Sequence, residues 1–486
     1  MLNKKMTLIF GLASMTLMTA CGGRSNDSSK PNPDNSKDSA TSGTTPVTPP
    51  EKDEEFDPKK PVEITFWHTM GKTSGQPILD QIITAFNKIY PYITVTNTQQ
   101  GGYDELNKAI NNNIATGNLP TMAYAYEDHV AGYVDHNASL DMTSYINDPV
   151  YGLGRNPTGY DLGDLGVEDM SAGYWKSGSN YAVEGMYSLP FSKSTEVLFY
   201  NKTVFDAKGW EVPTTWDELW ELCETIKSDD TYKDDKYTCL GWDSDANLLI
   251  TNFVQRGLPY TTSDRSGSEN SHFHFSTQAN KDVVTKLKEY YDKKYFLTKG
   301  TSANNAYTST QFTAQSILMT VSSTGGTKHC HTPDFETGVT GIPQYDKTNK
   351  AVISQGPSVT FFKKGTTKAQ RTAAWLFYKF ATNTKNSALF GSGTGYNPVR
   401  NSSYSDEVFE NIKSEEAGEG ALIRDMFSYV GSEESGYAEA QFTSPAFKGS
   451  SQARLSMDGL LSSVLLGTKT VDQAFDQAMS ECLFAE

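Results

Sequence analysis

The most conspicuous chemical motif of the chain is a glycine-rich stretch, GSGTGYNPVR at residues 391–400. Glycine-rich loops hold phosphates in dinucleotide-binding proteins, where the pattern G-x-G-x-x-G lies between a strand and a helix. The glycines here are too closely spaced, and Pro398 prevents a helix from following directly. A nucleotide site is therefore excluded. On the residues alone, the stretch is interpreted as a flexible turn after an apolar helix at 369–382.

Hydrolytic chemistry is a second function to consider for this chain. A hydrolase needs a nucleophile with its base, or a pair of working carboxylates, and the sequence contains neither G-x-S-x-G nor H-E-x-x-H. Acidic residues are plentiful, so a carboxylate pair is the remaining enzymatic alternative. We expect that the protein is not an enzyme.

Histidine and cysteine come together at His329, Cys330 and His331, and again at His272 and His274. Adjacent ligands rarely suit one tetrahedral ion, and neither group has a third partner at zinc-site spacing. We therefore expect no metal site and no cofactor.

The N-terminus has the features of a secretory signal peptide. Lys4 and Lys5 precede an apolar run from Met6 to Met18, and small residues lead to Cys21. The sequence MTAC resembles the lipobox of bacterial lipoproteins, in which the cysteine receives a lipid. We predict a signal peptide at 1–20, a lipid anchor on Cys21 and an extracytoplasmic, membrane-anchored location.

Residues 21–60 are rich in Ser, Thr, Pro, Asp and Lys and cannot bury enough apolar surface to fold. As a coil of about 40 residues they would span on the order of 35 Å. This segment is predicted to be a tether. The rest of the chain is long enough for two domains with substantial cores. The net charge of −16 argues against nucleic acid as a partner.

Four cysteines follow Cys21 and allow three disulfide pairings that the sequence cannot rank: Cys223, Cys239, Cys330 and Cys482. The first two would close the shortest loop. Free buried thiols are the favoured interpretation.

Hydrophobic periodicity predicts the elements that must position any site. A strand at 62–69 is followed by a helix at 76–91, a strand at 93–98, a helix at 103–117 and a strand at 121–126. This order is typical of a parallel sheet covered by helices. A second unit begins with a strand at 194–202 and a helix at 214–227, where Thr215 and Glu218 form a possible capping box.

In open α/β sheets, ligands bind beyond the carboxyl ends of the strands. Tyr103 and Glu127 directly follow the second and third predicted strands. They therefore locate a site without identifying its ligand.

The chain resembles the extracellular solute-binding proteins of ABC importers, most closely those that bind glycerol-3-phosphate. The resemblance extends from about residue 62 to the C-terminus and is carried by an ordered set of loose motifs. These are ITFWHTM (64–70), GGYDELNKAI (101–110), TGNLPTMAYAYE (116–127), YSLPFSKSTEVLFYNK (187–202), TTWDEL (214–219), GVTGIPQYD (338–346), GTGYNPVR (393–400) and GTKTVDQAFDQA (467–478).

The resemblance implies an α/β clamshell of the type II periplasmic-binding-protein class, with two lobes joined by crossover strands. Lobe 1 is expected at 61–193 and 339–386, and lobe 2 at 194–338 and 387–486. It further implies a monomer that delivers a small ligand to the transmembrane subunits of a permease. The ligand-binding residues carried over are Tyr103, Glu127, Ser194, Trp242, Ser323, Gly356, Tyr396 and Arg454.

These residue types suit a phosphate monoester of glycerol. Arg454 offers a guanidinium fork, the serines, Tyr396 and the Gly356 backbone offer neutral donors, Glu127 accepts from glycerol hydroxyls and Trp242 offers an apolar face. The glycines before Tyr396 would then let backbone approach the ligand. One departure is Gln355, where the family carries glycine. A glycerophosphodiester or an oligosaccharide is the alternative ligand, and the sequence does not identify the permease.

Overall fold

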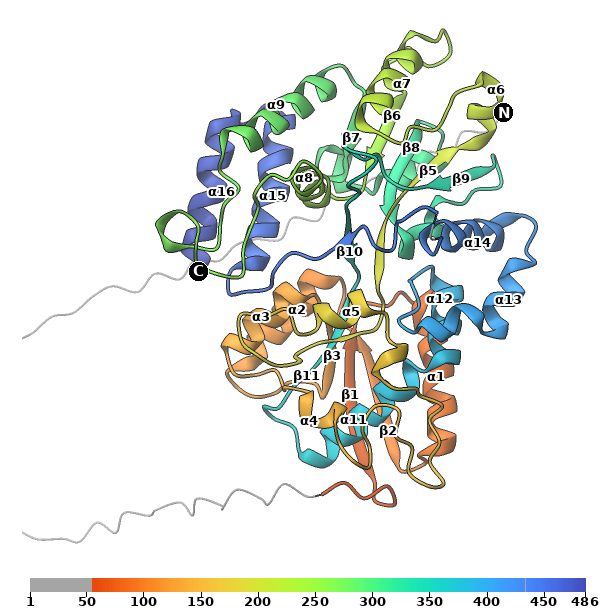
Figure 1. Ribbon diagram of the computed structural model, residues 1–486, viewed down its shortest axis with the longest axis vertical. Helices are drawn as coiled ribbons and strands as arrows, with labels where there is room; N and C mark the ends of the chain where they lie inside the picture. The colour runs from red at the N-terminus through yellow and green to blue at the C-terminus, as the bar shows by residue number, and fades with distance from the viewer. Residues whose placement is uncertain (1–54, 433) are drawn as a thin grey trace, which may run out of the picture. The chain divides into compact units, whose positions relative to one another are not determined.

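The computed structural model describes residues 55–432 and 434–486, and the description below concerns these residues (Figure 1). The predicted signal peptide, the lipid anchor at Cys21 and most of the tether lie outside them. No helix of the described residues is both long enough and apolar enough to span a membrane.

The first sheet has five strands in the order β2-β1-β3-β11-β4. β1 pairs in parallel with β2 and β3, and β11 is antiparallel to β3. Its strands are β1 (Val62–His68), β2 (Ile93–Gln99), β3 (Met122–Ala125), β4 (Leu189–Pro190) and β11 (Ser358–Phe361). The predicted order of strands and helices is confirmed here.

Helices that contribute to the core of this sheet have an apolar face at helical spacing, as α1 shows with Leu79, Ile82, Ile83 and Phe86 buried. α1 and α11 pack beside one another, and α11 lies against β1. The helices of this group are α1 (Gly75–Ile89), α2 (Tyr103–Ile114), α3 (Glu127–Asp135), α4 (Thr143–Ile146), α5 (Ala172–Ser177), α11 (Lys368–Ala381) and α12 (Thr384–Thr394).

The second sheet has seven strands, in the order β12-β10-β5-β8-β6-β7 with β9 paired to β5. Its strands are β5 (Ser194–Asn201), β6 (Thr238–Trp242), β7 (Phe296–Thr298), β8 (Ile317–Ser323), β9 (Thr337–Thr340), β10 (Val352–Gln355) and β12 (Gln441–Phe442). Strand pairing therefore places 352–355 beside β5, although the expected lobe boundary grouped these residues with 61–193. The lobe boundaries themselves stay a prediction.

A separate hydrophobic core surrounds this second sheet. Its α-helices are α6 (Lys202–Lys208), α7 (Trp216–Ser228), α8 (Asp245–Gln255), α9 (Gln278–Asp292), α10 (Thr308–Thr313), α13 (Glu407–Lys413), α14 (Gly418–Val430), α15 (Ser450–Leu465) and α16 (Val471–Ala485). Short 3-10 turns are η1 (Val167–Asp169), η2 (Ser268–Asn270), η3 (Lys299–Thr301), η4 (Ala303–Asn305), η5 (Thr324–Cys330) and η6 (Asn401–Ser405). The capping box of Thr215 and Glu218 at the start of α7 is confirmed.

The chain passes between the two sheets at short connections. β4 belongs to the first sheet and β5 to the second, with three residues between them, while β10 and β11 make the return crossing around Gly356. Gly356 has φ +83°, and a Cβ there would lie 2.0 Å from the carbonyl oxygen of Ser192. Only glycine fits this crossing without displacing backbone.

The expectation of free thiols was wrong for one pair of cysteines. Cys223 of α7 and Cys239 of β6 form a disulfide, with their Cα atoms 5.5 Å apart. Helix α7 packs on β6 and so brings the two side chains together, a tertiary contact that cysteine spacing does not reveal. Cys330 and Cys482 are free and buried.

The glycine-rich stretch begins as the last turn of a helix and not as a loop. Gly391 and Gly393 lie within α12, and Gly395 ends this helix in a left-handed conformation. A Cβ on Gly393 would lie 2.2 Å from Cδ1 of Ile78, so this glycine allows α12 to pack closely on α1. The turn interpretation was therefore wrong for 391–394, whereas 395–400 lie outside the helix.

Candidate ligand-binding site

Three tyrosines from separate elements meet beyond the ends of the first sheet's strands. Tyr103 begins α2, Tyr126 immediately precedes α3, and Tyr396 follows α12. The hydroxyl oxygens of Tyr103 and Tyr396 lie 3.2 Å apart, and the rings of Tyr103 and Tyr126 are 4.9 Å apart, edge to face. Burial raises the pKa of each of these hydroxyls, so all three stay protonated and available as donors.

Arg454 lies on α15, and one of its terminal nitrogens donates a hydrogen bond to the side-chain oxygen of Asn247 on α8. Burial alone would lower its pKa, but the nearby carboxylates of Asp128 and Asp458 outweigh that effect and raise it. The guanidinium is therefore a permanent positive charge held in a fixed direction.

A small cavity of about 70 Å³ brings groups from both cores together. Tyr126, Glu127 and Asp128 line it from the start of α3, while Gln355 and Arg454 line it from β10 and α15. The volume accommodates a few water molecules at most. Of the three tyrosines only Tyr126 lines this cavity, and Tyr103 and Tyr396 do not. A ligand larger than a few water molecules would need more space than the cavity holds.

Glu127 is held more firmly than the sequence indicates. Its Oε1 accepts hydrogen bonds from Lys193 Nζ at 2.6 Å, from Ser358 Oγ at 2.8 Å and from Ser177 Oγ at 3.1 Å. Burial would raise its pKa, but the charge and hydrogen bond of Lys193 prevail and lower it. Glu127 is therefore ionised, and one of its two oxygens is fully engaged by the protein.

Ser194 and Gly356 both lie at the crossing between the sheets. Ser194 is buried at the start of β5 and is paired with Gln355 of β10, and the carbonyl oxygen of Gly356 accepts from Lys193 Nζ at 3.3 Å. Neither residue lines the small cavity. Their position places them at the crossover strands.

Trp242 does not present an open face to a ligand. It is fully buried, its ring is stacked on Trp216 with centroids 5.5 Å apart, and its Nε1 donates to Glu196 Oε1 at 3.2 Å. Ser323 ends β8 and caps η5, and its Oγ accepts from the backbone nitrogen of Gly325. In this arrangement both residues support neighbouring groups and do not line the small cavity.

A polar network behind Arg454 was missed from the sequence. Asn247 Nδ2 donates to Glu196 Oε1 at 2.7 Å and to Gln355 Oε1 at 3.0 Å, while its own oxygen accepts from Arg454. Burial raises the pKa of Glu196 to about 7. The signal was present in STEVLFYNK, because a glutamate within an apolar strand run must be buried with polar partners.

No group of three His, Cys, Asp or Glu side chains in the described ranges 55–432 and 434–486 is arranged to hold a metal ion. The polar groups of the site are instead hydrogen-bond donors, one guanidinium and carboxylates.

Two α/β units with separate cores, joined by crossing strands and meeting around a polar cavity, define a two-lobed ligand-binding protein of the type II clamshell class. The family model described as bacterial extracellular solute-binding protein matches residues 81–415. The chain belongs to this family of extracytoplasmic solute-binding proteins.

Among its relatives, the chain is 25% identical over 428 residues to the sn-glycerol-3-phosphate-binding periplasmic protein UgpB of Escherichia coli K12, which covers 86% of this chain and 90% of the relative. It is similar in structure to UgpB of Mycobacterium tuberculosis, solved in complex with glycerophosphocholine, with 16% identity, a TM-score of 0.68 and 87% and 98% of the two chains covered.

The fold is also shared with sugar-binding members. The cyclic alpha-maltosyl-1,6-maltose binding protein of Arthrobacter globiformis is 18% identical, with a TM-score of 0.65 and 87% and 98% of the two chains covered. The fold thus accommodates both phosphodiester and sugar ligands, and the ligand of this chain must be argued from its own side chains.

Proposed function

We propose that this protein is the substrate-binding lipoprotein of an ABC import system and that it captures sn-glycerol-3-phosphate or a related glycerophosphodiester between its lobes. The observation that carries the proposal is the position of Arg454, whose guanidinium lines the small cavity together with Tyr126. A planar guanidinium matches two phosphate oxygens, and neutral hydroxyls supply further donors without adding charge.

Tyr103 and Tyr396 fit the same role. Their hydroxyls contact one another, so a phosphate entering between them would replace that contact with two donated hydrogen bonds. Glu127, whose second oxygen is not bonded to Lys193, would accept from a glycerol hydroxyl. Ser194, Ser323, Gly356 and Trp242 would shape or support the site from the crossover strands and the second sheet.

The cavity volume requires the lobes to separate before a ligand enters and to close around it afterwards. A protein of this kind carries its ligand unchanged to the transmembrane subunits of a permease, and we propose that this one is not an enzyme. It would act as a monomer, anchored to the membrane through lipid on Cys21, with no role for nucleic acid.

A sugar or oligosaccharide is the second candidate. Tyr126 and Tyr260 both line the small cavity, and Asp128 adds a carboxylate beside them. Aromatic rings and carboxylates together suit the faces and hydroxyls of a sugar ring. Such a ligand has no need of the positive charge on Arg454.

A thermal-shift screen distinguishes the candidates. Mature protein would be melted with glycerol-3-phosphate, glycerophosphocholine, maltose and longer maltodextrins at fixed ionic strength. A ligand at 100 times its Kd stabilises the folded state by about 2.7 kcal/mol. Stabilisation by a phosphate ester alone supports the proposal, whereas stabilisation only by sugars would overturn it in favour of the second candidate.

A further inference from the structure

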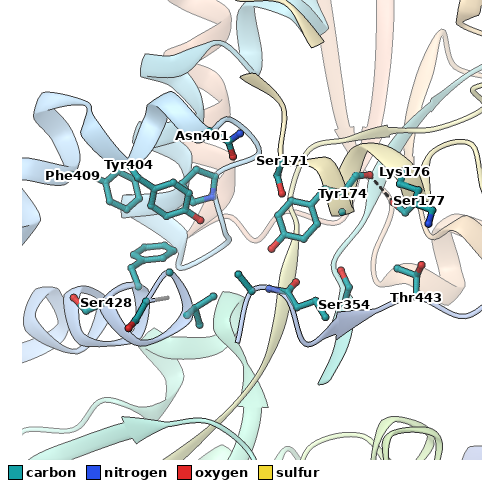
Figure 2. Close-up of a pocket in the computed structure, with 18 of the residues that line it drawn as sticks. Ser171, Tyr174, Lys176, Ser177, Ser354, Asn401, Tyr404, Phe409, Ser428 and Thr443 are labelled. Atoms are coloured by element: carbon teal, nitrogen blue, oxygen red, sulfur yellow. Dashed lines mark hydrogen bonds between the residues drawn. The ribbon is translucent and has the colours of Figure 1, made fainter. Parts of the chain in front are cut away.

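A second cavity, larger than the one that contains Arg454, lies elsewhere in the described residues. Its volume is about 840 Å³, and Figure 2 shows the residues that line it. One wall is the segment around α5, with Tyr174 and Lys176. The opposite wall is η6, α13 and α14, with Tyr404, Phe409 and Ser428. We call this space the α5–α14 cavity.

The α5–α14 cavity is separate from the proposed phosphate site. None of the eight residues carried over from the resemblance lines it, and it shares only Ser354 and Thr443 with the small cavity. Ser354 belongs to β10, one of the strands that cross between the sheets. The crossover thus separates two cavities that differ in both size and lining.

Its volume lies within the range of small-molecule sites, about 300 to 1,000 Å³. The lining is aromatic on the α13–α14 side, where the rings of Tyr404, Phe409 and Phe427 contact one another with centroids 5.0 to 6.3 Å apart. Tyr174 faces them from α5 (Figure 2). These flat apolar surfaces suit a ring or an acyl chain.

The charge of the lining is one-sided. Lys176, Lys413 and Arg424 line the α5–α14 cavity, and its lining residues include no aspartate or glutamate. This is unusual for a chain in which 58 acidic residues outnumber 42 basic ones. Lys413 is exposed and pairs with Glu410. Arg424 is partly buried, pairs with Asp425 and also donates to the backbone carbonyl oxygen of Glu415. None of these three partners lines the cavity. Exposed ion pairs are weak, so Lys413 in particular can turn to an entering anion.

A buried polar atom also lacks a partner here. The side-chain oxygen of Gln441, on β12, has no hydrogen-bond donor among the described residues. Leaving a buried acceptor unpaired is destabilising, and a donor on a ligand would satisfy it.

From these features we propose that the α5–α14 cavity is a second binding site, for a small amphipathic anion with an aromatic ring. The ring would lie among Tyr404, Phe409 and Phe427, and the anionic group would face Lys413 and Arg424. This proposal does not depend on the identity of the ligand in the small cavity.

The position of the walls gives this site a consequence for ligand capture. Tyr174 belongs to the core of the first sheet, whereas Phe409 and Phe427 belong to the core of the second. A molecule that contacts both walls stabilises one relative position of the lobes. Its occupancy should therefore change the affinity of the small cavity, and by linkage the reverse effect must be equal.

The test uses mature protein and two fluorescent probes of similar shape. 8-Anilinonaphthalene-1-sulfonate is an aromatic anion, and N-phenyl-1-naphthylamine is its neutral counterpart. We expect saturable binding of the anion to folded protein. Lys413→Gln with Arg424→Gln should weaken anion binding at least fivefold and leave the neutral probe within twofold. Lys288→Gln, at an exposed ion pair on α9, is the matched charge control.

A blocking variant makes the location testable. Ser428 is exposed on α14 and lines the α5–α14 cavity, so Ser428→Trp should fill it and reduce anion binding at least tenfold. Ser228→Trp, an exposed serine at the end of α7, is the control. Melting curves must show that each variant is folded. Absence of saturable anion binding, or binding unaffected by Ser428→Trp, would overturn the proposal.

Discussion

The hydroxyl oxygens of Tyr103 and Tyr396 lie 3.2 Å apart although 293 residues separate them in the chain. Tyr103 starts a helix of the first core, and Tyr396 follows α12, against Phe390. Their contact links two distant chain segments at the place where the proposed ligand would enter.

The first prediction concerns this contact. Tyr103→Phe and Tyr396→Phe should each weaken binding of glycerol-3-phosphate by about 1 to 2 kcal/mol, because each removes one donor to the phosphate. The double variant should lose less than the sum if the two donors act on the same oxygen. Calorimetry at fixed salt measures the cycle, with Tyr92→Phe, an exposed tyrosine, as control. Unchanged affinity in both single variants would remove the tyrosines from the site.

The second prediction concerns pH. Burial raises the pKa of Glu196 from 4.5 to about 7, so between these values the folded protein holds a proton that the unfolded chain has lost. Stability from this group therefore falls as pH rises from about 4.5 to 7 and is constant above. The shift corresponds to about 3 kcal/mol.

Glu196→Gln removes this titration and keeps an oxygen for Trp242 and Asn247. The variant should gain stability relative to the unaltered protein as pH rises from 5 to 8. Urea unfolding at four pH values in this range measures the difference, and Glu289→Gln on the exposed face of α9 is the control. A difference that does not change with pH contradicts the raised pKa.

Much of the fold could be predicted because its elements carry local signals. The alternation and the four-residue spacing between 62 and 126 predicted β1, α1, β2, α2 and β3 in order. Thr215 and Glu218, as a capping box, likewise predicted the start of α7. Such patterns are readable in the sequence because each element buries one face against a sheet or core, and the apolar residues of that face recur at the period of the helix or strand.

The sequence did not predict residue environments that depend on packing between elements far apart in the chain. The role of Trp242 stays a prediction, but its ring, on β6 between β8 and β7, is covered by Trp216 in this arrangement, a contact that the sequence does not reveal. Gly393 lies in a helix because Ile78 of α1 requires a residue without a side chain there. Asn247 joins Glu196, Gln355 and Arg454 from four elements that are far apart in the chain. No local sequence pattern predicts contacts of this kind between distant side chains.

The third prediction concerns the disulfide. Replacing Cys223 and Cys239 together by alanine should lower the free energy of unfolding by about 3 kcal/mol, the loop-closure value for a bridge with a sequence separation of 16. Urea unfolding without reductant measures this loss. Cys330→Ala, at a buried free thiol, controls for the loss of packing. An equal loss in the control and in the double variant would show that the bridge contributes nothing beyond packing.

The fourth prediction concerns the anchor. Cys21→Ala should release intact protein from the membrane, because the predicted lipid attaches to this sulfur. Fractionation followed by immunoblotting measures the change. Cys482→Ala, which alters a buried cysteine, should remain with the membrane. Retention of the Cys21 variant would contradict lipid anchoring.

The last prediction concerns Arg454. Arg454→Ala should reduce affinity for glycerol-3-phosphate by about 2 to 5 kcal/mol, because a desolvated phosphate loses its charged partner. Arg454→Lys should restore only part of this loss, since an ammonium lacks the planar fork. Arg265→Ala, at a half-exposed arginine that lines neither cavity, is the matched control.

Calorimetry at fixed ionic strength gives these affinities, and equal values for Arg454→Ala and the unaltered protein would defeat the phosphate assignment. A substitution at Gln355 tests which of the two phosphate esters the site prefers. Its side chain lines the small cavity and is held by Asn247, so Gln355→Gly should enlarge the site beside Arg454. If glycerol-3-phosphate is the ligand, this change should weaken it and improve glycerophosphocholine, because the larger head group gains room. If Gln355→Gly changes the affinities for the two esters by the same factor, Gln355 has no part in selecting the head group.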